Sequence, residues 1–79
     1  MTTYTARFSD EVKTRKSHRH YEAAFRVRLQ GATSVHTTIG FSRTLQLATQ
    51  AAEREAAPYR NTGRVYSLMD VEVVAVTAE

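Results

Sequence analysis

The chain has 79 residues, of which one is proline, three are glycine and none is cysteine. This length excludes two domains, and the absence of cysteine excludes disulfides, thiol nucleophiles and thiolate zinc sites. Eleven Lys and Arg residues against eight Asp and Glu residues give a formal net charge of +3, which permits a polyanionic partner. We therefore expect a single domain over residues 1–79 with a marginal core.

The first predicted element is a strand over residues 3–12. Apolar Tyr4, Ala6 and Phe8 alternate there with polar neighbours, which is the period of two that a half-buried strand shows. The following segment 14–18 is polar, charged and without periodicity. It is predicted to be the connection of a hairpin.

The clearest alternation in the sequence predicts a second strand over residues 21–30. Five apolar residues occupy every second position in it: Tyr21, Ala23, Phe25, Val27 and Leu29. A shift of one residue would move this whole set into water, so the register of the strand is well specified. A turn over 31–34 and renewed alternation then predict a third strand over 35–41.

The apolar period next changes from two to 3.6, which predicts a helix. Ser42 is the expected N-cap, an alanine-rich stripe follows, and Pro58 ends the helix after about residue 57. A loop over 58–63 precedes a long, valine-rich last strand over 64–77.

This last strand is predicted to be irregular. Its apolar residues fall on one parity up to Leu68 and on the other from Val71 onward, so we expect a bulge or bend near 69–70. The alternative is a strand end that is apolar on both faces, which would imply a second layer such as another subunit.

Together these elements predict an α+β fold of the order β-β-β-α-β, with an antiparallel sheet and a single helix packed on one face. A right-handed crossover through the helix would place the last strand along an edge, beside the first. The expected spatial order is 4-1-2-3.

The sequence contains no constellation that favours catalysis. His18 and His20, with His36 as a third ligand, would be the only histidine metal site, but polar residues at a hairpin mouth are the favoured interpretation. Asp70 and Glu72 share a strand face and are interpreted as solvated outer residues. We therefore predict a protein that is not an enzyme and that uses no metal or cofactor.

Positive charge is concentrated in the first half of the chain. Residues 1–43 hold eight basic and three acidic side chains, and residues 44–79 hold three basic and five acidic ones. The predicted partner-binding residues are those of the first hairpin and of the outward face of the second strand: Lys13, Arg15, Lys16, His18, Arg19, His20, Arg26 and Arg28. Two interpretations stay open: a basic ribbon that follows phosphates or an acidic protein groove, and an edge hairpin that charge protects against aggregation.

Two β-β-β-α modules resemble the middle of the chain. The run Phe25-Arg26-Val27-Arg28-Leu29, the turn at Gly31 and the run Ile39-Gly40-Phe41-Ser42 before a helix carry this likeness. The modules are the amino-terminal arm-binding domain of phage-type integrases and the double-stranded RNA-binding domain. Either resemblance implies a nucleic-acid-binding function.

A third resemblance covers more of the chain. The segment 42–57 and the following segment 63–72 are similar to the helix, glycine turn and terminal strand of some small phage-encoded anti-CRISPR proteins. This resemblance implies a rigid, single-domain binder that occupies a surface of a defence complex.

We accordingly predict a small non-enzymatic protein of phage or mobile-element type, an inhibitor that covers a functional surface of a host CRISPR–Cas complex. The alternative is a nucleic-acid-binding module that uses the basic face of the first hairpin. The expected partners are a host protein or ribonucleoprotein, or a nucleic acid, and a twin chain in a homodimer through the terminal strand. With no signal-peptide pattern and no apolar run of membrane-spanning length, the expected location is cytoplasmic, in the host cell if the protein is phage-encoded.

Overall fold

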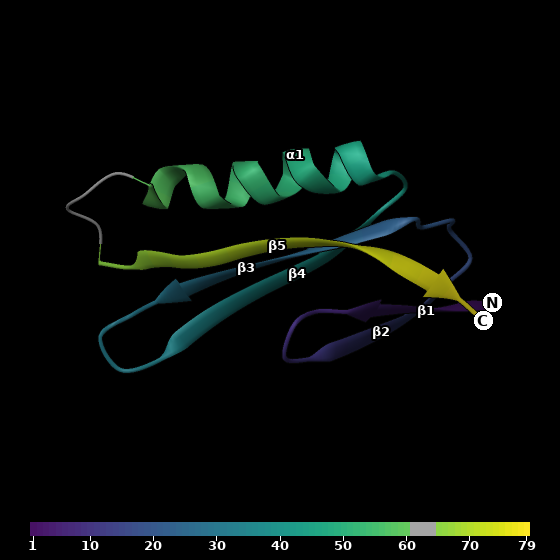
Figure 1. Ribbon diagram of the computed structural model, residues 1–79, viewed down its shortest axis with the longest axis horizontal. Helices are drawn as coiled ribbons and strands as arrows, with labels where there is room; N and C mark the ends of the chain where they lie inside the picture. Colours follow the sequence, from purple (N-terminus) through teal and green to yellow (C-terminus); the bar gives the residue numbers. More distant parts are fainter. Residues whose placement is uncertain (61–64) are drawn as a thin grey trace.

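The computed structural model describes residues 1–60 and 65–79. Within them the chain forms a five-stranded antiparallel sheet and one α-helix (Figure 1). In chain order the elements are β1 (Thr2–Arg7), β2 (Val12–Ser17), β3 (Ala23–Gln30), β4 (Val35–Ser42), α1 (Leu45–Ala56), the 3-10 turn η1 (Ala57–Tyr59) and β5 (Ser67–Ala78). The class is α+β, as predicted, but the predicted arrangement of four strands is wrong.

The last strand lies in the middle of the sheet. The spatial order is β2-β1-β5-β3-β4, and β5 pairs with β3 over Ser67 to Ala75 and with β1 over Val76 to Ala78. The predicted order 4-1-2-3 is therefore wrong, because it placed this strand at an edge. The expected homodimer contact through the terminal strand required that edge, so its basis is removed.

The extra strand is β2, in a segment that was expected to be mostly loop. The backbone turns after β1, where Phe8 N donates to Glu11 O at 2.8 Å, and the chain then returns along β1. Five of the six β2 side chains are exposed and Ser17 is half-buried. An edge strand that is wet on both faces needs no apolar alternation, so the period-two pattern by which strands are recognised is missing.

One layer of the core lies between the helix and the sheet. Ala48, Ala52 and Ala56 of α1 are buried, and they allow the helix to lie close to Phe25 and Val27 of β3. The helix begins two residues later than predicted. Its N-cap is Thr44, whose Oγ1 accepts from Leu47 N at 3.1 Å, while Ser42, the predicted cap, ends β4.

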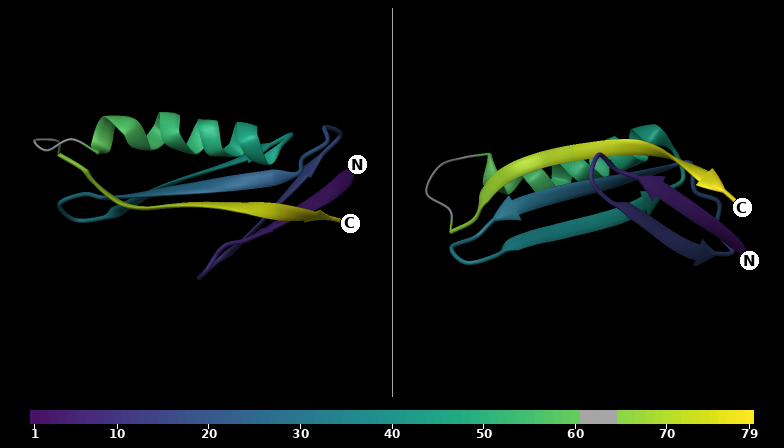
Figure 2. Two further views of the ribbon diagram at one scale, coloured as in Figure 1. Left: turned by 45° about the horizontal axis from the view of Figure 1, so that its top comes forward. Right: turned by 60° about the horizontal axis from the view of Figure 1, so that its bottom comes forward.

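The other layer is formed by the N-terminal hairpin. β1 and β2 cross the face of the sheet opposite to α1 (Figure 2). The apolar residues packed between hairpin and sheet are Ala6, Phe8, Ala24, Ile39, Phe41, Val74 and Val76. Valines on both faces of the last strand are therefore covered by the chain itself, and the second layer that they implied requires no other subunit.

The predicted irregularity of the last strand is confirmed. Arg28 pairs with Asp70 but Leu29 pairs with Leu68, so Met69 is an extra residue opposite the step from Arg28 to Leu29. This bulge changes the parity of β5, and it brings Leu68 to the same helix-facing side as Val71. The predicted loop over 58–63 starts with η1, and its last three residues, with the turn expected at residue 63, lie outside the described part of the chain.

Gly40 creates the space that a core aromatic ring occupies. It lies opposite Phe25 in the β3–β4 pair, and a Cβ atom at position 40 would be 2.5 Å from Cε1 of that ring. The ring thus covers the glycine backbone on the helix-facing side of the sheet, and only glycine allows so close an approach.

We predict that Gly40→Ala lowers the free energy of unfolding by about 1–3 kcal/mol, because the Phe25 ring must leave its position against the helix. Chemical denaturation measures this change. Thr14→Ala, at an exposed position of the edge strand β2, serves as the control and should stay within about 0.5 kcal/mol of the parent chain. Equal stability of both variants would contradict the role of Gly40.

Candidate functional site: the basic edge

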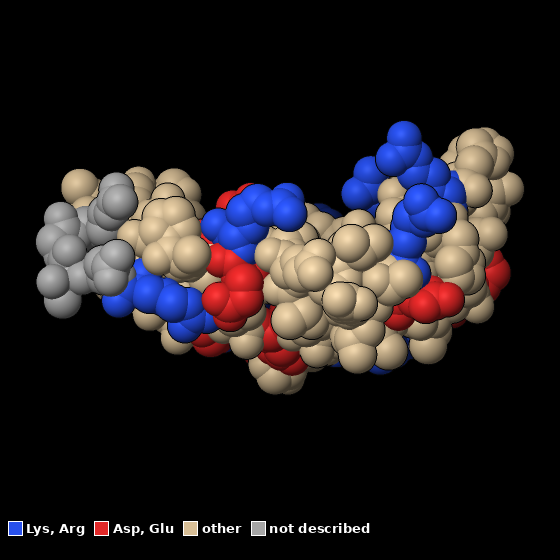
Figure 3. All heavy atoms as spheres, turned by 90° about the horizontal axis from the view of Figure 1, so that it is seen from above, with Lys and Arg blue, Asp and Glu red and all other residues tan. Residues whose placement is uncertain are grey.

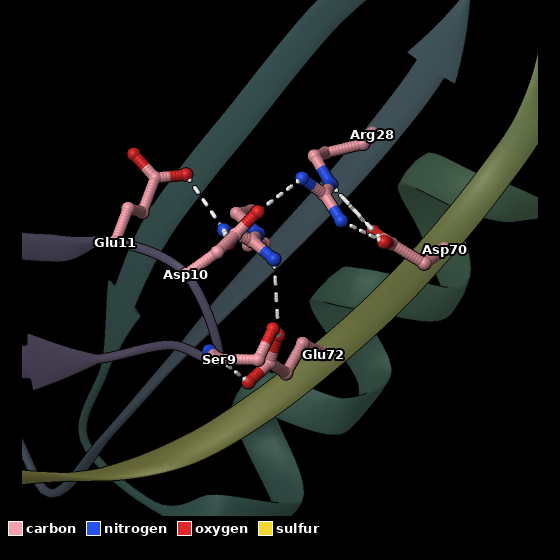
Figure 4. Close-up of polar contacts among 7 residues, drawn as sticks. Ser9, Asp10, Glu11, Arg28, Asp70 and Glu72 are labelled. Carbon is pink, nitrogen blue, oxygen red and sulfur yellow. Dashed lines mark hydrogen bonds and ion pairs between the residues drawn. The ribbon is translucent and has the colours of Figure 1, made fainter.

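Arg26 is the centre of a network of ion pairs on the hairpin-covered face of the sheet. Its side chain is fully buried, although its partners reach solvent. Nη1 donates to Asp10 Oδ1 at 2.5 Å and to Glu11 Oε1 at 2.7 Å, and Nη2 donates to Glu72 Oε1 at 3.0 Å (Figure 4). The guanidinium also lies 5.1 Å from the centre of the Phe8 ring. Carboxylates from the hairpin turn and from β5 thus neutralise this charge.

Arg28, two residues further along β3, extends the same network. Its Nε donates to Asp70 Oδ1 at 3.0 Å, its Nη2 donates to Asp70 Oδ2, and its Nη1 donates to Asp10 Oδ2 at 2.8 Å. Asp10 therefore bridges the two arginines, and Figure 4 shows its contact with Arg28. We call the six charged residues the arginine network: Asp10, Glu11, Arg26, Arg28, Asp70 and Glu72.

The arginine network attaches the β1–β2 turn to the sheet. Ser9 strengthens this attachment, because its backbone N and its Oγ donate to the two carboxylate oxygens of Glu72 at 2.8 and 3.0 Å. The attachment has a cost, since Nε of Arg26 is buried without a hydrogen-bond partner among the described residues. A buried guanidinium is tolerated here because its other nitrogens are charge-paired.

The network also shifts the titration of its members. The hydrogen bond from Arg26 lowers the pKa of Asp10, and Arg28 lowers it further, against the opposing effect of partial burial. The hydrogen bond from Arg28 likewise lowers the pKa of Asp70. Both carboxylates are therefore charged at neutral pH, as the two guanidinium groups always are, so the ion pairs of the network are present there.

Two expectations about this face are wrong. Arg26 and Arg28 were predicted to point outward, but the hairpin covers them, and their charges are used inside the molecule. Asp70 and Glu72 were predicted to be solvated, but both are half-buried in the same network. The signal that sequence reasoning missed is the complementary spacing of these residues, which places Arg26 opposite Glu72 and Arg28 opposite Asp70 in the β3–β5 pair.

The other six predicted residues lie together on the surface. Lys13, Arg15 and Lys16 belong to β2, at one edge of the sheet, and the segment 18–20 connects β2 to β3. All six side chains are exposed, and we call them the basic edge: Lys13, Arg15, Lys16, His18, Arg19 and His20. Within the described residues the four Lys and Arg side chains of this set have no ion pair, whereas His20 lies 3.1 Å from Glu22.

The fold gives the basic edge a defined geometry. Lys13 and Arg15 lie opposite Ala6 and Tyr4, so they project on one side of the hairpin, and Lys16 projects on the other. The Arg15 guanidinium lies 5.5 Å from the centre of the buried Tyr21 ring. The space-filling view shows Lys and Arg atoms gathered in a raised patch near one end of the molecule (Figure 3).

The structure places the third histidine apart from this edge. His36 lies on β4, where its ring meets that of Tyr66 edge-on at 4.7 Å. Among the described residues no group of three or more His, Cys, Asp or Glu side chains is placed to hold a metal ion. In the same part of the chain no helix is long and apolar enough to cross a membrane.

Comparisons with known proteins give no family for this chain: no protein-family model, no curated protein and no solved structure matches it.

We predict that Arg26→Met lowers the free energy of unfolding by about 3 kcal/mol, because Glu11 and Glu72 lose their counter-charge, Asp10 keeps only Arg28, and the hairpin turn loses most of its attachment. Chemical denaturation tests this. Arg19→Met removes an exposed arginine outside the network and should change stability by less than about 0.5 kcal/mol. If both variants changed the free energy of unfolding by equally small amounts, the arginine network would not stabilise the fold.

The network also predicts loss of stability in acid. The pKa values of Asp10 and Asp70 in the folded chain lie below the ordinary value of 3.8. Their contribution is therefore fully present above that value and is lost as pH falls through the folded-state pKa values. Denaturation between about pH 5 and pH 2 should show this decline, and Asp70→Asn should weaken it. Glu55→Gln, on the exposed helix surface, should keep the full decline, and an unchanged decline in Asp70→Asn would be contrary evidence.

Proposed function

We propose that the chain is a non-enzymatic binding protein whose basic edge contacts the phosphate backbone of a nucleic acid. The observation that supports this most is the separation of its positive charges into two sets. Arg26 and Arg28 are neutralised internally, while the Lys and Arg side chains of the basic edge are exposed and have no acidic partner among the described residues.

The charge balance outside the arginine network supports the same conclusion. The network contains two of the eleven basic residues and four of the eight acidic ones. The rest of the sequence therefore has nine basic and four acidic residues, and the segment 12–20 has four Lys and Arg and no Asp or Glu. Outside the network, the excess of basic over acidic residues is greatest at the basic edge.

The chemistry of this edge fits phosphates better than bases. Lys13 and Arg15 are separated by one residue of an extended strand, so their backbone positions on the same side are about 6.8 Å apart. Such cations contact successive anionic groups along a chain. The edge carries no Asn or Gln for paired hydrogen bonds to adenine, and Tyr21 is buried rather than free for stacking. The proposed binding is therefore largely independent of base sequence.

The inhibitor hypothesis uses the same surface. In that form of the proposal the basic edge occupies a nucleic-acid-binding or acidic surface of a CRISPR–Cas complex, and the small rigid fold blocks access to it. The support for it is the size of the chain and the exposed, unneutralised cations, together with the resemblance in layout to small phage inhibitors.

Binding to labelled duplex and single-stranded oligonucleotides, measured by fluorescence anisotropy over a range of salt concentrations, tests the proposal. Four phosphate contacts predict a slope of log affinity against log salt of about −3.6 for duplex DNA and about −2.8 for a single strand. The double variant Lys13→Gln/Lys16→Gln should reduce the duplex slope in magnitude by about 1.8.

Arg54→Gln is the matched control, because Arg54 is an exposed arginine on the helix, outside the basic edge. It should leave both affinity and slope close to those of the parent chain. Failure to bind either oligonucleotide at low salt would overturn the phosphate contact. Capture of a nucleic-acid-free acidic protein, lost in the double variant, would then favour the protein-groove form of the hypothesis.

A further inference from the structure

The two edges of the sheet differ in charge. β2, at one edge, has three basic residues among six, whereas β4, at the other, has no Lys, Arg, Asp or Glu among eight. Natural sheets prevent unwanted pairing at an edge by charge, proline, bulges or shortness. β4 contains no charged residue or proline, and its register with β3 is unbroken over the whole strand. It is therefore an edge that can accept another strand.

The exposed part of β4 is its first half, at the free margin of the sheet. The side chains from Val35 to Thr38 are exposed, and those from Ile39 to Ser42 are half-buried. In the right view of Figure 2, the first half of β4 forms the free margin of the sheet, clear of α1 and of the β1–β2 hairpin. Alternate residues of this strand direct their N–H and C=O groups away from β3, where an added strand can bond with them.

We infer that β4 pairs antiparallel with β4 of a second copy of this chain, which joins the two sheets across a two-fold axis at Thr38. Antiparallel pairing about that residue places Thr38 opposite its twin and Thr37 opposite Ile39. It also places Val35 opposite Phe41 on the hairpin-facing side, a β-branched and aromatic pair that sheets favour. His36 falls opposite Gly40, so no two titratable side chains meet.

Charge favours self-pairing through β4 over self-pairing through β2. Pairing of two β2 strands would place the lysines and arginine of one copy beside those of the other, which is unfavourable. Pairing of β4 with itself brings no charged side chains together and covers Val35, which is 47% exposed. A second copy also supplies apolar burial that a chain of 79 residues lacks on its own.

The joined sheet leaves the basic edge free. In the order β2-β1-β5-β3-β4, β2 and β4 lie at opposite ends, so self-pairing of β4 places the two basic edges at the two outer ends of a continuous sheet. This inference is independent of the proposed nucleic-acid contact, and each can fail without the other.

Sedimentation velocity over a range of concentrations tests the pairing. The parent chain should show a monomer–dimer equilibrium in which the fraction of dimer rises with concentration. Thr38→Lys and Thr38→Glu should each weaken dimerisation at least about tenfold, because like charges meet at the axis, and an equimolar mixture of the two should restore it through opposite charges. Circular dichroism and denaturation test whether each variant is folded, so that loss of the dimer can be distinguished from unfolding.

Thr14→Lys is the matched control: it adds the same charge at an exposed threonine in the middle of the other edge strand. It should leave the dimer unchanged. A parent chain that remains monomeric at the highest concentration overturns the inference. So does a dimer that Thr38→Lys leaves intact, or an open-ended assembly in place of a closed pair.

Discussion

A buried guanidinium on the face of a small sheet determines how the rest of this protein is arranged. Arg26 lies in the middle strand pair, where water cannot solvate it, and it is stable there only if carboxylates reach it. Glu72 comes from the neighbouring strand, but Asp10 and Glu11 come from the turn of the hairpin. The hairpin must therefore lie across this face, and its position and the burial of Arg26 depend on each other.

The same constraint explains how so short a chain forms two core layers. β5 is apolar on both faces at its C-terminal end, and it is covered by an alanine-rich helix on one side and by the hairpin on the other. The result is an elongated body of about 42 × 23 × 18 Å, in which each layer is thin. The network joins three segments that are remote in sequence, with partners up to 46 residues apart, so it forms only when all of them are in place.

Charge is divided among three regions with different consequences. In the arginine network, the cations are paired with carboxylates of the same chain. The basic edge has exposed cations that a partner can contact, and β4 is an edge without charged residues. The protection of an edge strand against aggregation and the contact with a polyanion were two interpretations of one basic hairpin. In the structure they are compatible, because β2 is both an edge strand and an exposed row of cations. What separates the two edges is therefore electrostatics, since both offer unpaired backbone groups.

The local pattern of apolar residues in the sequence determined most of the secondary structure of this protein. The alternation in β3 and β4, the change to a helical period, and the parity change that becomes the bulge at Met69 are all visible in sequence, because each follows from which side of one element faces apolar surroundings. The α+β class and the exposure of the six basic-edge side chains follow as well. Tertiary structure alone decided that β2 is a strand, that β5 is central, and that Arg26 and Arg28 are neutralised. A strand wet on both faces has no apolar period, and a polar face looks solvated until another segment of the chain is known to cover it.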